Sequence, residues 1–246
     1  MNQPVALITG AARRIGATIA KYLHDEGYNL VLHYNNSSED TQKLCDSLNQ
    51  QRKNSCIALQ ADLREISSVE ELGKKAIAHW QRLDALINNA SSFYPTPVGE
   101  ITPNDWQDLI GTNLQAPLFL SQACAPSLKL TKGCIINIAD IHGERPLSRH
   151  TVYCIAKAGN IMLTKSLAKD LAPEIRVNGI APGTILWPEN AAEISDEIQE
   201  IILKRIALKK IGDPTDIAKT ILFLLKDAPY ITGQIIAVDG GRNLVS

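Results

Sequence analysis

The chain has 246 residues, of which 45% are hydrophobic and 21% charged, and its formal net charge is -1. These values are ordinary for a globular protein, and they disfavour a nucleic-acid-binding surface or an acidic membrane partner. Its five cysteines include no C-x-x-C pair, no apolar run reaches the roughly 18 residues of a membrane span, and no signal peptide precedes the first apolar run. We therefore expect a cytoplasmic protein without disulfides or a metal site.

Short apolar runs alternate with longer amphipathic stretches along the whole chain. The runs are Val5–Ile8, Leu30–Tyr34, Cys56–Leu59, Ala85–Ile87, Cys134–Ile138, Ile175–Ile180 and Gln234–Val238. The amphipathic stretches include Ala17–Glu26, Val69–Trp80, Asp105–Leu128 and Val152–Leu171. This alternation indicates βαβ units with strands buried on both faces. It predicts an α/β fold in which residues 1–246 form a single domain with a doubly wound parallel sheet, a Rossmann-like architecture.

The alternation is interrupted once, between Pro182 and Pro214. The intervening residues contain a helical pattern near Glu193–Ile206. An insertion at this place lies above the carboxyl ends of the strands, where open α/β sheets bind ligands. We therefore predict a substrate lid at approximately residues 184–213, with an ordinary surface excursion as the alternative. Trp187 stands at the entrance of this lid and is expected to border the substrate pocket.

The first strand leads into the sequence Thr9-Gly10-Ala-Ala-Arg13-Arg14-Ile15-Gly16, after which a helix begins. A tight turn between a strand and a helix N-terminus places backbone N–H groups and the positive end of the helix dipole at a pyrophosphate. The position of the turn between the first strand and the first helix makes this a specific signal for a dinucleotide. The alternative is that the two glycines only form a turn.

The residues after the second strand bear on the choice between NADH and NADPH. NAD-binding proteins place a carboxylate there for the ribose 2′-hydroxyl. In this chain the strand ends His33-Tyr34-Asn35-Asn36-Ser37-Ser38, and the first carboxylate is Glu39. Arg13 and Arg14 supply cations in the neighbouring turn, which would attract a 2′-phosphate. The sequence therefore favours NADPH, unless one of the arginines is only a solvated charge at the start of the helix.

A set of landmarks in the correct order resembles the short-chain dehydrogenase/reductase superfamily over the full length of the chain. The landmarks are the turn at 9–16, Asp62, Asn88-Asn89-Ala90, Asn113, Tyr153-x-x-x-Lys157, Asn178, Pro182-Gly183 and Val238-Asp239-Gly240-Gly241. The resemblance implies that the cofactor is held by Gly10, Arg13, Arg14, Ile15, Gly16, Tyr34, Asn35, Asn36, Ser37, Asp62, Leu63, Asn89, Ala90, Ser91, Tyr153, Lys157, Pro182 and Gly183.

The pair Tyr153 and Lys157 is separated by four residues, which places both side chains on one face of a helix. A neutral tyrosine is a willing proton donor, and a nearby lysine is expected to lower its pKa. Such a pair alone occurs by chance in many helices. The resemblance implies that Tyr153 is the proton donor, that Lys157 binds the nicotinamide ribose and tunes the tyrosine, and that Asn113 organises a water-linked proton path.

One position departs from most of the superfamily, in which a serine stands thirteen residues before the tyrosine. Here that residue is Asp140. An ionised carboxylate only accepts hydrogen bonds, so it suits a substrate with N–H groups better than a carbonyl. Pteridine reductases carry aspartate at this place. The segment from Asn88 to Pro97 also resembles these reductases, in which the aromatic at the position of Phe93 stacks on the pterin. They carry arginine at the position of Arg14 as well.

We therefore expect NADPH-dependent reduction of a pterin or dihydropterin, and of a folate as a further candidate, by hydride transfer to a ring C=N bond. The expected substrate contacts are Arg14, Ser91, Phe93, Asp140, Tyr153 and Trp187, and the expected catalytic residues are Asp140, Tyr153, Lys157 and Asn113. His142 and His150 flank the site and are expected to be surface or hydrogen-bonding residues. The alternatives are a general carbonyl reductase for a 3-oxoacyl thioester or sugar, and an NADPH-binding protein without catalysis. The resemblance also implies a homotetramer, through helices matching Asp105–Leu128 and Val152–Leu171.

Overall fold

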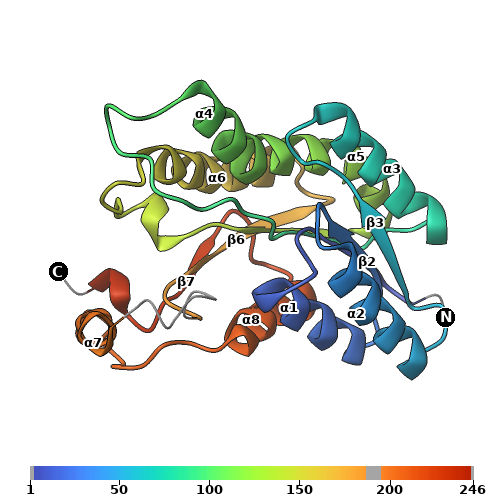
Figure 1. Cartoon of the computed structure of the whole chain (residues 1–246). Helices are drawn as coiled ribbons and strands as arrows, with labels where there is room; N and C mark the ends of the chain where they lie inside the picture. Colours follow the sequence, from blue (N-terminus) through green and yellow to red (C-terminus); the bar gives the residue numbers. More distant parts are fainter. Residues whose placement is uncertain (1–2, 187–194, 245–246) are drawn as a thin grey trace.

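The protein is built on a parallel sheet of seven strands in the order β3-β2-β1-β4-β5-β6-β7 (Figure 1). The computed structural model describes residues 3–186 and 195–244. The strands are β1 (Val5–Ile8), β2 (Asn29–Tyr34), β3 (Cys56–Gln60), β4 (Ala85–Asn88), β5 (Cys134–Ile138), β6 (Arg176–Pro182) and β7 (Ile235–Val238). The strand order reverses between β1 and β4, so the predicted doubly wound fold is confirmed. A ligand-binding crevice is expected at the carboxyl ends of these two strands.

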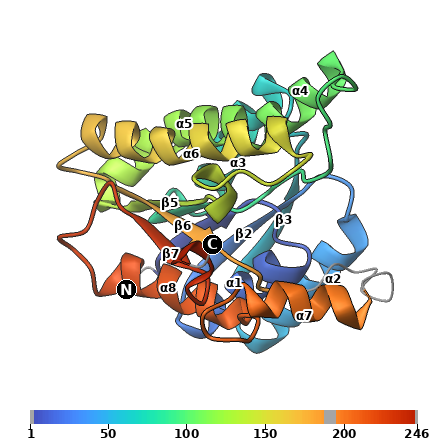
Figure 2. The ribbon, with the colours of Figure 1, turned by 90° about the vertical axis from the view of Figure 1, so that its left-hand side faces the viewer.

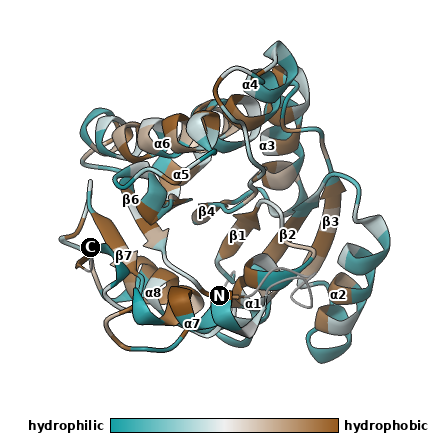
Figure 3. Cartoon of the chain, turned by 60° about the vertical axis from the view of Figure 1, so that its left-hand side comes forward, coloured by the Kyte–Doolittle hydropathy of each residue, from teal (hydrophilic) through white to brown (hydrophobic). Residues whose placement is uncertain are grey.

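Helices cover both faces of the sheet (Figures 1 and 2). One face carries α1 (Arg14–Asp25), α2 (Ser38–Gln51) and α8 (Pro214–Lys226), and the other carries α3 (Ile66–Trp80), α4 (Pro103–Ile110), α5 (Ala116–Thr131) and α6 (Thr151–Asp170). The strands between these layers are coloured as hydrophobic along much of their length, as Figure 3 shows for β1 and β3. Burial on both faces explains why the strands appear in the sequence as continuous apolar runs.

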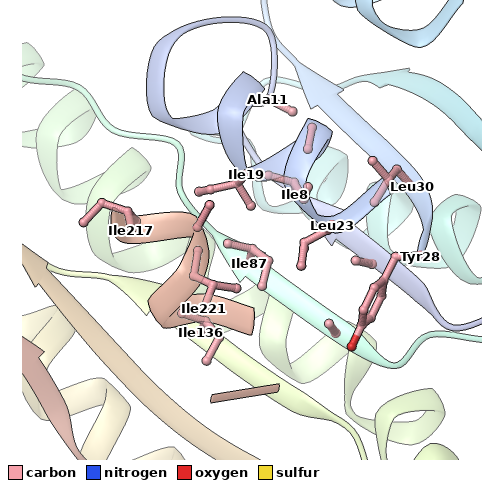
Figure 4. Packing of buried hydrophobic residues seen from close by; sticks show 14 of the residues in the cluster. Ile8, Ala11, Ile19, Leu23, Tyr28, Leu30, Ile87, Ile136, Ile217 and Ile221 are labelled. Atoms are coloured by element: carbon pink, nitrogen blue, oxygen red, sulfur yellow. The ribbon is translucent and has the colours of Figure 1, made fainter. Parts of the chain in front are cut away.

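Successive residues of a strand point to opposite faces, and each face has its own core. Ile8 and Ile87 pack with Ile19 of α1 and Ile221 of α8 (Figure 4). Leu7, the neighbour of Ile8, belongs to the second core, on the side of α3 and α5. These side chains are fully buried, and each contributes about 1.5–3 kcal/mol relative to exposure. The two cores hold β1 and β4 rigidly under the crevice.

The predicted helix over Asp105–Leu128 is interrupted by a π-helical turn, Gly111–Gln115, between α4 and α5. The amide that would bond the Asn113 carbonyl in an α-helix belongs to residue 117, which is a proline without an N–H group. The carbonyl instead accepts the side-chain amide of Asn160, on α6, at 3.0 Å. The turn therefore joins α6 to the middle of this helical stretch.

Part of the predicted lid is helical. α7 (Asp196–Lys204) lies within the expected helical pattern, and the Ser195 hydroxyl caps it by accepting the amide of Ile198 at 3.4 Å. Trp187 lies outside the described residues, so its expected place at the pocket stays a prediction. Within residues 3–186 and 195–244, no helix is long and apolar enough to cross a membrane.

Candidate active site

The turn between β1 and α1 approaches the end of β4 closely. Gly10 has a φ of +63°, and a Cβ there would lie 2.9 Å from the Ala90 Cα; a Cβ at Gly16 would collide with the Gly10 carbonyl. The Thr9 hydroxyl accepts the amides of Asn89 and Ala90 at 2.9 and 3.0 Å. No side chain caps the N-terminus of α1. A closely packed turn before an uncapped helix N-terminus fits a pyrophosphate.

Arg14 also adopts a positive φ, of +52°, in this turn. A non-glycine residue in this region has its Cβ too close to the backbone, at a cost of about 1–2 kcal/mol. Gly10 and Gly16 stand on either side of the arginines, so the turn keeps its shape at a local cost in backbone strain at Arg14. Strain of this kind is typical of positions whose side chain has a function.

A cavity of about 640 Å³ lies over the turn, within the range of small-molecule sites. Most of the predicted cofactor residues line it: Gly10, Arg13, Arg14, Ile15, Gly16, Tyr34, Asn35, Asn36, Ser37, Asp62, Leu63, Asn89, Ala90 and Ser91. The chain thus provides a glycine cradle for a pyrophosphate and polar groups at the end of β2 for a ribose. These residues fit a dinucleotide cofactor.

His33 supports this turn from β2, a role that the sequence did not predict. Its Nδ1 accepts the Gly10 amide at 3.2 Å, and its Nε2 lies 3.1 Å from the Ala61 carbonyl, to which it must donate. One accepting and one donating nitrogen define a neutral imidazole. Burial lowers the pKa of His33 to about 4, against the opposing effects of the Ala61 carbonyl and the Asp62 carboxylate. His33 is therefore a buried, neutral connection between β2 and the cofactor turn.

The predicted catalytic residues meet at the carboxyl end of β5. The Tyr153 hydroxyl donates to Asp140 Oδ2 at 2.7 Å, and Asp140 Oδ1 accepts the backbone amide of His142 at 2.8 Å. The second bond starts a short turn after β5 and fixes the carboxylate. Lys157 Nζ donates to the Ile138 carbonyl at 2.9 Å and lies 5.6 Å from the centroid of the Tyr153 ring.

Burial and a neighbouring carboxylate keep the Tyr153 hydroxyl protonated. Burial and then the nearby Asp140 carboxylate raise the pKa of Tyr153 above its ordinary value, while the neighbouring Ser91 hydroxyl opposes the shift. The net shift in the chain by itself is therefore upward, and the expected lowering of the Tyr153 pKa by Lys157 together with the positive nicotinamide stays a prediction. Burial also lowers the pKa of Lys157 to about 8, against the opposing effect of Asp140. A neutral tyrosine next to a carboxylate is a proton donor and a poor base.

Asn113 joins the catalytic residues to the cavity. Its side-chain amide donates to the carbonyls of Leu109 and Ser92 at 2.9 and 3.0 Å, and its Oδ1 accepts the Ser91 hydroxyl at 2.6 Å. Ser91 lines the cavity and also contacts the Tyr153 hydroxyl. The side chain of Asn113 therefore anchors the loop after β4, while its carbonyl is held by Asn160.

Phe93 lies beside Tyr153 with more than half of its side chain exposed. Its ring stacks on His150, with centroids 4.7 Å apart, and meets Tyr153 edge-on at 4.8 Å. Neither contact was predicted, because His150 precedes α6 in a loop without a periodic pattern. An exposed aromatic ring held in place by two others offers a flat surface on which a heteroaromatic ring can stack.

Pro182 and Gly183 lie at the carboxyl end of β6, as predicted. The Gly183 amide donates to the Val238 carbonyl at 3.0 Å, and a Cβ at Gly183 would lie 2.7 Å from the Asp239 Cα. Glycine is therefore required by the close approach of β6 to the segment after β7. These residues lie on the same edge of the sheet as Asp140 and the cofactor turn.

Comparisons with known proteins agree with this geometry. Residues 10–243 match the family model described as Enoyl-(Acyl carrier protein) reductase. The chain is 36% identical to Pteridine reductase 1 of Leishmania tarentolae, with 98% of this chain and 96% of that protein covered. It is 38% identical to the 3-oxoacyl-acyl-carrier-protein reductase FabG of Staphylococcus aureus (strain Mu50), with 96% of each covered. It is 33% identical to Granaticin polyketide synthase putative ketoacyl reductase 2 of Streptomyces violaceoruber, with 98% and 97% covered.

Proposed function

Because this chain belongs to the short-chain dehydrogenase/reductase family, we propose that it is an NADPH-dependent reductase of pterins, with dihydropterins as the main substrates and folates as further candidates. Membership of the family makes the protein an oxidoreductase that resembles pteridine reductase. The choice of substrate depends on the residues that the site places next to Tyr153.

The observation that carries the proposal is the hydrogen bond from the Tyr153 hydroxyl to Asp140. A carboxylate at this place cannot donate to a carbonyl oxygen, but it accepts from the N–H groups of an amino-pyrimidine ring. Phe93 adds a flat surface beside it, and Arg14 adds a cation that can hold a ring oxygen. A pterin presents the N–H groups, the flat ring and the oxygen that these three residues can bind.

NADPH, when bound, supplies the hydride to a carbon of the ring C=N bond. The residues of the chain manage the proton that must reach the adjacent nitrogen. The Tyr153 hydroxyl turns from Asp140 to that nitrogen and donates its proton, while the released carboxylate accepts an N–H of the substrate. The positive charge of Lys157 offsets the negative charge that Tyr153 then carries. Asn113 and Ser91 keep the loop after β4 in place beside the reacting ring.

The second candidate is the reduction of a 3-oxoacyl thioester. The identity to FabG is as high as that to the pteridine reductase, and the description of the family model also names an acyl carrier protein. The pair of Tyr153 and Lys157 would serve this reaction equally well. Asp140 disfavours it, because the carboxylate would repel the developing alkoxide at the substrate carbonyl. A protein that binds NADPH without turnover is the remaining alternative, and the complete set of Asn113, Tyr153 and Lys157 disfavours it.

The test is the rate of NADPH oxidation with dihydrobiopterin, dihydrofolate and acetoacetyl thioester under the same conditions. We expect kcat/KM for dihydrobiopterin or dihydrofolate to exceed that for the thioester by at least tenfold. A preference for the thioester would replace the proposal by the second candidate. Binding of NADPH without oxidation in the presence of any of the three compounds would favour the non-catalytic alternative.

A further inference from the structure

The N-terminus of α2, next to the cavity, has a capping motif that is not closed. Ser37 and Asp40 have the spacing of a capping box, in which the two side chains bond each other's backbone amides. Ser37 makes no side-chain cap bond. The same spacing forms complete capping boxes at Thr102 with Asp105 and at Asp213 with Asp216. The difference needs a local cause.

The carboxylate of this motif is paired instead with Arg13, the residue predicted to select the 2′-phosphate. Asp40 Oδ2 lies 2.5 Å from Arg13 Nε, so the carboxylate that could cap α2 is the counterion of this arginine. Both side chains are partly exposed to solvent. Arg13, Asn36 and Ser37 line one wall of the cavity, at the end of β2 where the adenosine ribose is expected.

We propose that Asp40 is a specificity-determining residue that limits the preference of this protein for 2′-phosphorylated nucleotides. A 2′-phosphate must share Arg13 with the carboxylate and lies close enough to the carboxylate to be repelled by it. A nucleotide with a free 2′-hydroxyl experiences neither effect. Asp40 therefore weakens the binding of NADPH selectively and narrows its advantage over NADH. This inference rests on the cofactor part of the proposed function and is independent of the pterin.

The chain offers a matched control in the neighbouring residue. Glu39 is also in the first turn of α2, but it pairs with Lys43 at 2.6 Å and is highly exposed. Glu39→Gln and Asp40→Asn remove the same charge one residue apart, so only the contact with Arg13 distinguishes them. An exposed ion pair contributes little to folding, and an asparagine can still accept a hydrogen bond, so both variants should fold. Thermal unfolding verifies this before binding is measured.

The experiment measures dissociation constants for 2′,5′-ADP and 5′-ADP by calorimetry, and for NADPH and NADH by fluorescence, without turnover. In Asp40→Asn we expect 2′,5′-ADP and NADPH to bind about 5- to 10-fold more tightly than in wild type. Binding of 5′-ADP and NADH should stay within twofold. Glu39→Gln should change all four constants by less than twofold. High salt should shrink the gain of Asp40→Asn, because it screens the charges.

A second background isolates the role of the arginine. In Arg13→Ala the additional Asp40→Asn substitution should give a smaller gain for 2′,5′-ADP than in wild type, because only the direct repulsion by the carboxylate is left to relieve. The inference is overturned if Asp40→Asn leaves 2′,5′-ADP binding unchanged or weaker, if Glu39→Gln produces the same gain, or if the full gain persists in Arg13→Ala. Failure to reduce pterins would contradict the proposed function and leave these results standing. If the wild type binds NADH more tightly than NADPH, only the cofactor part of the proposed function is contradicted.

Discussion

At the scale of single residues, one hydrogen bond distinguishes the two candidate reactions. The Tyr153 hydroxyl has a single proton, which forms a hydrogen bond to Asp140 in this structure. A substrate nitrogen can take that proton only if the carboxylate receives another donor in exchange. A pterin provides such a donor, whereas a simple ketone leaves Oδ2 of the half-buried Asp140 carboxylate without one. The arrangement therefore favours substrates that both accept and donate hydrogen bonds on one edge.

Asp140→Ser tests this exchange directly. Losing a charge-assisted hydrogen bond in a desolvated site costs about 1.5–3 kcal/mol, which corresponds to a decrease in kcat/KM for dihydropterin of at least about tenfold. Serine restores a donor for a carbonyl, so the rate with simple ketones should stay level or rise. Both rates are read from NADPH oxidation. Equal losses with both substrates would indicate misfolding, and an unchanged rate with dihydropterin would contradict the role of Asp140.

The charge on Lys157 is expected to set an upper pH limit on activity. Burial lowers its pKa to about 8, so the ammonium that stabilises the reacting tyrosine is present below pH 8 and lost above it. We expect kcat/KM to fall as the pH rises through about 8. The Tyr153 pKa is raised, so the tyrosine itself does not produce this limb. In Lys157→Arg the residual activity should persist to higher pH, because a guanidinium stays charged. A flat wild-type profile up to pH 10 would contradict this assignment.

At the scale of elements, the cofactor turn combines two neighbouring arginines with opposite backbone requirements. Arg14 has a φ of +52°, whereas Arg13, which precedes α1, has an extended φ of -140°. Only Arg14 is in the left-handed region that favours glycine. In our proposal its side chain contacts both cofactor and pterin, which would account for strain at this position.

Arg14→Gly should stabilise the fold and weaken the site. Relief of the left-handed strain minus the added freedom of the unfolded chain leaves a gain of about 0.5–1 kcal/mol in the free energy of unfolding. For a chain of this size the gain corresponds to an increase of about 1–4 °C in Tm. NADPH and dihydropterin should both bind more weakly. Arg13→Gly is the matched control and should not raise Tm. If Arg14→Gly lowers Tm, the side chain itself stabilises the turn.

The lowered pKa of His33 is expected to make the free energy of unfolding depend on pH in the acid range. Its pKa is about 4 when folded and 6.5 when unfolded, so below pH 6.5 the unfolded chain takes up a proton that the folded chain refuses. The stability that His33 contributes is complete above pH 6.5 and is lost as the pH falls toward 4, by up to about 3 kcal/mol. His33→Asn retains an acceptor for the Gly10 amide and should flatten this acid limb in urea unfolding. An acid limb of unchanged size would assign it to other groups.

At the scale of the whole molecule, the sequence predicted what depends on local pattern. Periodicity gave the strands and layers, and the spacing of Tyr153 and Lys157 placed both on one helix face. The π-helical turn at Asn113 was not predicted, because one extra residue in a turn hardly changes an amphipathic pattern. The roles of His33 and Asp40 depend on contacts between segments that are distant along the chain. His33 contacts Gly10 and Ala61, and Asp40 pairs with Arg13 although its spacing also suits a cap for α2. Such contacts leave no periodic pattern in the sequence.

Several large apolar side chains of α4, α5 and α6 are exposed. Trp106, Leu118, Ile155 and Met162 are all exposed. Ile155 and Met162 are seven residues apart on α6, so they lie on the same side of that helix, away from its buried residues. Where such side chains lie together they can form a contact surface between proteins. They match the helices through which the resemblance implied a tetramer.

We therefore predict that substitutions on this side of α6 change the size of the assembly. Two carboxylates in an apolar interface would be desolvated without partners, at a cost that a subunit contact of ordinary size cannot offset. The double variant Ile155→Glu/Met162→Glu should have half the molar mass of the wild type or less, measured by light scattering after gel filtration. Ile66→Glu adds a charge at a partly exposed apolar position in the first turn of α3 and should leave the mass unchanged. If the double variant keeps the wild-type mass, this face is not the subunit contact.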